Sequence, residues 1–355
     1  MHSRDRSAAT GSGFGAAVRR VLRTLVLLLV LLLVASIGLV IGKGAPNAEP
    51  SAAELALSEG AASAQALAAA ARLLETSAPA VEADYEAMAE MLDLHASALR
   101  PAASTGESPS PASSPAGSPS PTLPSAAPVA PSPADFLTNL THSYTSAFAA
   151  AAVVDAGPAR VLASAATAQW LRSRALAEDL GVTVPVIPVP ETRYDDGAAP
   201  NCPTQTTLTP DHGLDGARTA VLAEQRASYA YEIVAARADD PEALLDRMAA
   251  HEGSAAEGSE ILAQHCLAGP LPSAAYALDA SFSSGPDTAL RELEAALVGT
   301  YTDLVGVSAP GPVREWALRQ LAETAQGLVE SDAAELEVLP GIDPAEYPRL
   351  QDPAS

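Results

Sequence analysis

The sequence predicts an all-α protein in which a single N-terminal transmembrane helix is followed by two tandem four-helix bundles. Three observations predict this fold class. Hydrophobic residues make up 48% of the 355 residues and aromatic residues only 4%, so alanine and leucine dominate the apolar composition. Both lose little side-chain entropy in a helix. One long uncharged apolar run lies near the N-terminus, and two helical stretches with a similar order of motifs follow it.

Residues 21–42 are predicted to form the transmembrane helix. Residues 24–42 contain no charged group, and a helix of that length spans roughly 28 Å, which matches the hydrocarbon core of a bilayer. The alternative is a cleaved secretory signal, with Ala45-Pro46-Asn47-Ala48 as the cleavage region. The apolar stretch of such a signal is usually shorter, about 7–15 residues. With either interpretation, the body of the protein leaves the cytoplasm.

The charge distribution predicts the topology and the partners. Residues 1–43 carry a net charge of +5, from Arg4, Arg6, Arg19, Arg20, Arg23 and Lys43 against Asp5, which leaves −28 for residues 44–355. The positive-inside rule places residues 1–20 in the cytoplasm and residues 44–355 outside, as a single-pass protein of the cell membrane. We therefore expect the lipid bilayer as a partner through residues 21–42, envelope proteins as further partners, and no nucleic acid, because an acidic body repels phosphate.

Composition divides the exported body into segments. Residues 51–180 form the first predicted bundle, and residues 101–133 interrupt it with ten prolines among serine, alanine and glycine. Such a segment cannot bury a core and is expected to be a disordered linker. Residues 181–212 form an irregular connector, residues 213–335 the second bundle, and residues 336–355 a C-terminal tail.

The two helical halves share an order of short motifs. In the first half Leu94-His95 and Pro101 precede Tyr144-Thr145, Gly157-Pro158-Ala159-Arg160 and Trp170. In the second half Gln264-His265 and Pro270 precede Tyr301-Thr302, Gly311-Pro312-Val313-Arg314 and Trp316. Proline just inside a helix start is common, so the shared order carries more weight than Gly-Pro-x-Arg alone. It indicates an internal duplication, and four antiparallel helices with short connections form a bundle.

The first helix of the second half carries a sequence signature, Ala223-Glu224-Gln225-Arg226-Ala227-Ser228-Tyr229-Ala230-Tyr231. This stretch resembles the first-helix signature of an actinobacterial ferritin-like domain family of unassigned function. Further similarities lie at His251, Ala275-Tyr276-Ala277-Leu278, Leu293-Glu294, Tyr301 and Leu339-Pro340-Gly341. The resemblance implies a ferritin-like four-helix fold over residues 213–342, with a related bundle at 51–180, and it implies no activity. Gln225 stands where the family usually has histidine.

A metal site is the most specific chemistry to test. Ferritin-like di-iron sites need one glutamate from each of two helices and a Glu-x-x-His pair from each of the other two. The candidate ligands are Glu224, Glu257, Glu260 and Glu294, with Glu323 and Gln326 in the fourth helix. Both histidines of the Glu-x-x-His pairs are absent, because Glu260 and Gln326 stand in their places. The alternative is a set of glutamates on solvated helix faces, so we expect no cofactor, with iron as the alternative.

Other candidate groups have a plainer interpretation. His251 and His265 are two further candidate ligands, but a lone helical histidine is more often a packed or surface residue. We find no nucleophile elbow, phosphate loop, metalloprotease motif or dinucleotide fingerprint, and we assign no catalytic residue.

The two cysteines, Cys202 and Cys266, both lie in the exported part. An oxidising compartment favours one disulfide between them, and the alternative is two unpaired buried thiols. A bond would attach the irregular connector to the second helix of the second bundle.

Two functions from different classes remain open at this point. The first is a non-enzymatic, membrane-anchored extracytoplasmic bundle that binds a partner or ligand or acts as a scaffold. The second is a degenerate ferritin-like di-metal protein that handles iron or oxygen through Glu224, Glu257, Glu260 and Glu294.

Overall fold

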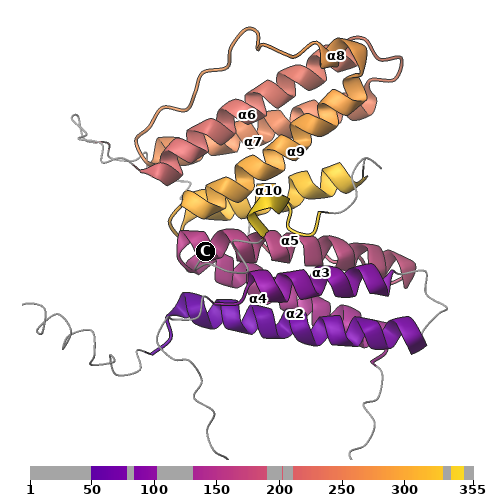
Figure 1. Cartoon of the computed structure of the whole chain (residues 1–355). Coiled ribbons are helices and arrows are strands. Elements are labelled where there is room, and N and C mark those ends of the chain that lie inside the picture. The colour runs from indigo at the N-terminus through magenta and orange to yellow at the C-terminus, as the bar shows by residue number, and fades with distance from the viewer. Residues whose placement is uncertain are drawn as a thin grey trace, which may run out of the picture. The chain divides into compact units, whose positions relative to one another are not determined.

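The computed structural model in Figure 1 describes residues 49–77, 84–101, 131–189, 202, 211–330 and 337–347. Within these ranges the regular elements are all helical, which confirms the predicted all-α class. The first half contains α2 (Ala52–Ser77), α3 (Tyr85–Ala98), α4 (Pro133–Val153) and α5 (Ala156–Asp179). The second half contains α6 (His212–Ala235), α7 (Glu242–Gln264), α8 (Ser281–Ser284), α9 (Pro286–Val307), α10 (Pro312–Glu330) and the 3₁₀ helix η1 (Pro344–Glu346).

Several predicted segments fall outside the described residues. These are the cytoplasmic residues 1–20, the transmembrane segment 21–42, residues 102–130 of the proline-rich linker, and most of the connector 181–212. Among the residues that the structure does describe, no helix is both long and apolar enough to cross a bilayer.

Polar caps and prolines decide where the helices begin. The Ser132 hydroxyl accepts the backbone N–H of Asp135, and the Asp135 side chain accepts the N–H of Ser132, so a capping box starts α4. Asp84 and Asp211 cap α3 and α6 in the same sense, because their carboxylates accept first-turn amides. Pro286 begins α9, where its missing N–H is not needed.

The boundary between α4 and α5 lies before the Gly157-Pro158 pair of the shared motif order. The break is at Val154 and Asp155, and Gly157 and Pro158 belong to the first turn of α5. The first amides of a helix have no intrahelical acceptor, so a proline in this turn removes no hydrogen bond. The Gly-Pro pair therefore marks the start of α5 rather than the gap before it.

The helices of each half pack mainly against one another. In the first half α2 packs against α3 and α4, and α4 packs against α5. In the second half α6 packs against α7 and α9, and α10 packs against α9, α7 and α6. Gly258 on α7 permits one close approach, since a β-carbon there would lie 2.6 Å from Val221 and 2.7 Å from the Trp316 ring.

The two halves share a core rather than forming separate ones. Helix α5 packs against α9 and α10, and one cluster of buried apolar residues includes Trp170 of the first half and Trp316 of the second. Because α5 is covered on several sides, its buried residues include small polar ones such as Ser164, Thr167 and Ser173, whose hydroxyls donate to backbone carbonyls. Those hydrogen bonds offset the desolvation of the hydroxyl groups.

The arginines of the two Gly-Pro-x-Arg segments each contact the opposite half. Arg160 of α5 forms ion pairs with Asp303 of α9 at 2.9 Å and with Glu346 at 2.8 Å. Arg314 of α10 is fully buried and donates to the carbonyl of Val154 at the end of α4 and to that of Ser308 at the end of α9. The carbonyls at a helix end lack intrahelical donors, so Arg314 satisfies acceptors from both halves at once.

The predicted C-terminal tail, residues 336–355, contains a packed segment at residues 337–347. Leu339 is fully buried and Ile342 is 2% exposed, so both belong to the shared core. The carbonyl of Pro340 accepts the hydroxyl of Ser164 on α5 at 2.9 Å and that of Thr302 on α9 at 3.1 Å. These contacts explain why a short apolar stretch at this position is ordered against α5 and α9.

Candidate functional site

A buried polar cluster lies between the helices of the second half. Glu224 comes from α6, His251 from α7 and Glu294 from α9, and their exposed fractions are 1%, 4% and 3%. Each lies on the stripe of its helix that faces the bundle interior, where Ala217, Ala220, Val221 and Tyr231 share the α6 stripe with Glu224. A charged group at such a position requires neutralising partners.

The His251 ring lies between the two carboxylates. Its Nδ1 donates to Oε2 of Glu224 at 2.6 Å, and its Nε2 donates to Oε1 of Glu294 at 3.2 Å. The two bonds are made by the two different nitrogens of one ring. The imidazole therefore lies between the carboxylates, which do not converge on one position.

Two tyrosines and one arginine complete the cluster. The hydroxyl of Tyr301 donates to Oε1 of Glu224, and the hydroxyl of Tyr231 donates to Oε1 of Glu294 at 2.7 Å. Arg247, one turn before His251 on α7, donates to the same oxygen of Glu294 at 2.5 Å. Its guanidinium reaches α10, where a β-carbon at Gly327 would lie 3.0 Å from Nη1. Helices α6, α7 and α9 therefore supply the side chains of the cluster, and α10 contacts it at Gly327.

The charges within the cluster balance. Burial alone lowers the pKa of His251, but the hydrogen bonds and charges of Glu224 and Glu294 outweigh it and raise the pKa to about 9. Burial alone raises the pKa of Glu294, but His251 and Arg247 outweigh it and lower the pKa to about 2. At neutral pH the imidazolium and the guanidinium thus face two carboxylates.

The cluster also leaves one polar atom without a partner. Three donors converge on Oε1 of Glu294, whereas its Oε2 is buried and has no hydrogen-bond partner. A carboxylate oxygen in this position has lost water without a full replacement.

The four glutamates of the predicted metal set occupy different environments. Glu224 and Glu294 belong to the cluster, while Glu257 pairs with Arg319 of α10 and Glu260 is exposed on α7. The sequence favoured a packed or surface residue at His251 over a metal ligand, and Arg247 was not among the candidate groups. A detectable signal was present, because Arg247 and His251 are four residues apart on α7 and therefore share one helix face.

The donor set of the cluster does not suit a di-metal centre. Such a centre needs two Glu-x-x-His pairs, and α7 instead presents an arginine and a histidine whose two nitrogens both donate to carboxylates. Within the described part of the chain, no group of three or more His, Cys, Asp or Glu side chains is arranged to hold a metal ion.

A cavity of about 410 Å³ lies on a neighbouring stripe of the same two helices. On α6 it is lined by Gln225, Ser228, Tyr229 and Glu232, and on α7 by Glu252, Ala255, Ala256 and Ser259. These positions follow the i, i+3, i+4, i+7 spacing of one helix face. The cavity stripe on α6 starts one residue after Glu224, so it is rotated by roughly 100° from the buried cluster.

The loop after α7 forms the outer wall of this cavity. The amide of Gln225 donates to the carbonyl of Pro270 at 2.9 Å, and the hydroxyl of Tyr276 donates to the Gln225 side-chain oxygen at 2.9 Å. Arg218 donates to the carbonyl of Ala268 at 2.9 Å. Gln225 thus contacts the wall and not the buried cluster.

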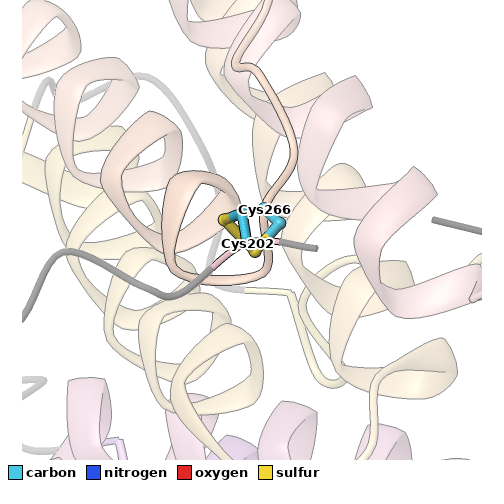
Figure 2. The surroundings of a disulfide bond; sticks show 2 residues. All are labelled: Cys202 and Cys266. Carbon is cyan, nitrogen blue, oxygen red and sulfur yellow. A yellow bond between two sulfur atoms is a disulfide. The ribbon is translucent and has the colours of Figure 1, made fainter. Parts of the chain in front are cut away.

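The predicted disulfide between Cys202 and Cys266 is confirmed and is shown in Figure 2. Cys266 follows the end of α7 and has a positive φ of 60°. Its N–H donates to the carbonyl of Ala263, and the N–H of Leu267 donates to that of Leu262, which is the Schellman arrangement. Glycine is usual at this position, so the disulfide occurs on a backbone conformation that a side chain disfavours.

These features define the second half as a helical bundle with a neutralised polar interior and a preformed cavity on one side. Residues 216–344, which include both the cluster and the cavity, match the profile of a family described as a domain of unknown function (DUF4439). Comparison with curated proteins and with solved structures gave no match.

Proposed function

We propose that this chain is a membrane-anchored extracytoplasmic binding module that catalyses no reaction, and that its ligand site is the cavity between α6, α7 and the loop after α7. The observation that carries the proposal is the preformed wall of that cavity. Gln225 joins the wall to α6 through Pro270 and Tyr276, and the disulfide joins its start to Cys202. A site that is already built needs little ordering when a ligand binds.

The anchor and the fold complete the proposal. The uncharged run at residues 24–42 and the basic flank before it support a helix at 21–42 that holds the acidic body outside the cytoplasm. The signature around Glu224 and the inward position of Glu224 and Glu294 support a ferritin-like bundle over residues 213–335. In this bundle the charged side chains of His251 and Arg247 neutralise the carboxylates of Glu224 and Glu294. The role of the cluster is therefore to stabilise the fold and not to take part in a reaction.

The binding function is tested with a fragment library and the full chain in lipid nanodiscs, observed by ligand-detected NMR. Ala256 lines the cavity from α7 and is exposed, so Ala256→Trp fills the space without disturbing the core. We expect fragments that compete for one site on the unsubstituted chain and lose their signal with Ala256→Trp. The matched control is Ala263→Trp, which adds the same ring at an exposed position of α7 outside the cavity. The absence of any fragment sensitive to Ala256→Trp would overturn the proposal.

A degenerate di-metal protein is the second candidate, and one observation favours it. The buried Oε2 of Glu294 has no partner, and an oxygen of that kind is a ligand that iron accepts. Elemental analysis of the full chain, purified without chelator, separates the candidates. The binding-module proposal expects less than about 0.1 metal ion per chain, since His251 and Arg247 already neutralise the carboxylates. Iron at two equivalents per chain, lost on Glu224→Ala, would establish the second candidate instead.

A further inference from the structure

The cavity between α6 and α7 has a lining of one electrostatic sign. The carboxylates of Glu232 on α6 and Glu252 on α7 both line it, and none of the described residues in its lining is basic. The hydroxyl of Ser228, one turn before Glu232 on α6, donates to Oε1 of Glu252 at 3.4 Å. Both glutamates are exposed, and two carboxylates of the same sign beside the apolar surface of the cavity give it a negative potential.

Aromatic rings form a second feature of the lining. The rings of Tyr229 on α6 and Tyr276 on the loop are 5.7 Å apart between centroids, with an angle of 55° between their planes. The Tyr276 hydroxyl is fixed in two directions, since it donates to Gln225 and accepts the N–H of Ser273 at 3.0 Å. The negative face of an aromatic ring attracts a cation within about 6 Å of its centroid.

The remaining lining is apolar or carries hydroxyl groups. Ala255, Ala256, Pro270 and Pro272 supply carbon surface, and Ser259 and Ser273 supply hydroxyls. A volume of about 410 Å³ lies at the lower end of the range for small-molecule sites. Carbon surface, aromatic rings and carboxylates together match a small molecule that is both apolar and positively charged.

We propose that this cavity binds a small organic cation, an ammonium or guanidinium compound whose charge lies between Glu232 and Glu252 and whose carbon groups lie against Tyr229 and Tyr276. The inference rests on the proposed binding function and specifies its ligand class. A bare metal ion is a poorer match, because it would leave the carbon surface of the prolines, alanines and tyrosines without a contact. The net charge of −28 on residues 44–355 increases the local concentration of cations around the site.

The test compares choline with its neutral carbon isostere, in which a carbon atom replaces the nitrogen. Isothermal titration of the full chain in nanodiscs should give an affinity for choline about tenfold higher than for the isostere, a difference that cation–π and carboxylate contacts can supply. Glu232→Gln with Glu252→Gln should lower choline affinity about tenfold and leave the weak binding of the isostere unchanged. Tyr229→Leu should lower choline affinity several-fold, and Tyr276→Phe, which keeps the ring, should lower it less.

The control variant removes the same charge outside the cavity. Glu260 on α7 and Glu292 on α9 are both exposed and do not line the cavity. Glu260→Gln with Glu292→Gln should leave choline affinity within about twofold, because an exposed charge outside the lining is screened by solvent and salt. Equal affinity for choline and the isostere, both lost with Ala256→Trp, would overturn the cation proposal while the binding function stands. No binding of choline at millimolar concentration would also overturn it, and the fragment screen would then decide the binding function separately.

Discussion

The two halves of the described chain each bury one histidine in a polar cluster, and the two imidazoles have different charges. His95 of α3 is fully buried; its Nε2 donates to the carbonyl of Val338 at 2.5 Å, and its Nδ1 accepts the amide of Gln169 at 3.3 Å. His251 of α7 donates from both nitrogens to Glu224 and Glu294.

Neighbouring charge explains the difference. Burial lowers the pKa of His95 to about 4, although the Val338 carbonyl opposes the shift, so His95 is neutral at pH 7. Burial acts in the same direction on His251, but two carboxylates reverse the outcome and raise the pKa to about 9. The comparison shows that burial favours the neutral form of histidine and that only a paired carboxylate keeps a buried imidazole charged.

The largest expected effect comes from removing one carboxylate of the second cluster. Glu294→Gln keeps the shape of the side chain but leaves Arg247 and His251 without an ionised partner, and we expect a loss of about 3–5 kcal/mol in the free energy of unfolding. Urea unfolding followed by circular dichroism measures it. Glu292→Gln is the matched control on the exposed face of α9 and should change stability by less than about 0.5 kcal/mol. Similar small effects for both variants would mean that the cluster is not held by charge.

The two histidines should also give opposite pH dependences. The pKa of His251 rises from 6.5 to about 9 on folding, so its stabilisation is present below pH 6.5 and is lost as the pH rises through 9. The pKa of His95 falls from 6.5 to about 4, so its stabilisation is present above pH 6.5 and is lost as the pH falls through 4. Each difference corresponds to roughly 3 kcal/mol.

Unfolding of the unsubstituted chain, His251→Gln and His95→Gln across this pH range measures the two dependences separately. The difference in the free energy of unfolding between the unsubstituted chain and His251→Gln should decrease as the pH rises from 6.5 to 9. The corresponding difference for His95→Gln should decrease as the pH falls from 6.5 to 4. If both differences decreased with the same direction of pH change, the charges assigned to His95 and His251 would be wrong.

The two halves also differ in how their buried tryptophans pack. Trp170 in the first half lies under Arg174 and donates to the carbonyl of Pro185 at 3.3 Å, whereas Trp316 in the second half packs against Gly258. Gly258→Ala should destabilise the chain by about 1–3 kcal/mol, because the new methyl group would overlap the Trp316 ring.

Gly253 lies five residues earlier on the same helix, and a β-carbon there would meet nothing within 4 Å. Gly253→Ala should therefore stabilise by about 0.5–1 kcal/mol through helix propensity alone. The difference in melting temperature between the two variants is the measurement, and destabilisation by both would indicate a general intolerance of α7 rather than the tryptophan contact.

The last effect, of about 1 kcal/mol, concerns the disulfide, which attaches the connector to the second half. Two variants lacking it, Cys202→Ala with Cys266→Ala and Cys202→Ala with Cys266→Gly, differ only at a residue whose φ is 60°. The glycine variant should be more stable by about 1 kcal/mol, because glycine adopts this conformation without the steric penalty of a β-carbon. Denaturant midpoints of the two variants test this, and equal midpoints would mean that the backbone relaxes when the bond is removed.

Much of the helical architecture follows from local sequence. Alanine and leucine content predicted the helical class, and the caps Ser132 and Asp211 and the prolines at the starts of α9 and α10 are local features that set where those helices begin. The disulfide was predictable as well, because a chain with two cysteines has a single intramolecular way to pair them. Glu224 and Glu294 were among the candidate metal ligands, but the sequence favoured solvated helix faces for that set, whereas the structure buries both side chains.

The partners of those carboxylates were not predictable in the same way. His265 was aligned with His95 from the order of motifs, yet His265 is exposed as the C-cap of α7, and His251 is the buried histidine of the second half. The order of motifs along the chain does not determine on which face of its helix a residue lies or how deeply that residue is buried. Likewise, residues 337–347 read as a tail because their few apolar residues have no local partner, and Leu339 becomes buried only between α5 and α9.

By itself, the sequence determined the helical class, the helix starts and the charge of residues 44–355, because these depend on residue type and on neighbours within a few positions. It also determined the disulfide, because the chain has only two cysteines to pair. Tertiary structure alone decided the shared core of the two halves, the opposite charges of His95 and His251, and the cavity beside the cluster. The physical reason is that a pKa and a cavity depend on groups from several helices at once. Glu224 and Glu294 are far from His251 along the chain, and both come within hydrogen-bonding distance of it only after the helices pack. The same holds for the contact between Arg247 and Glu294.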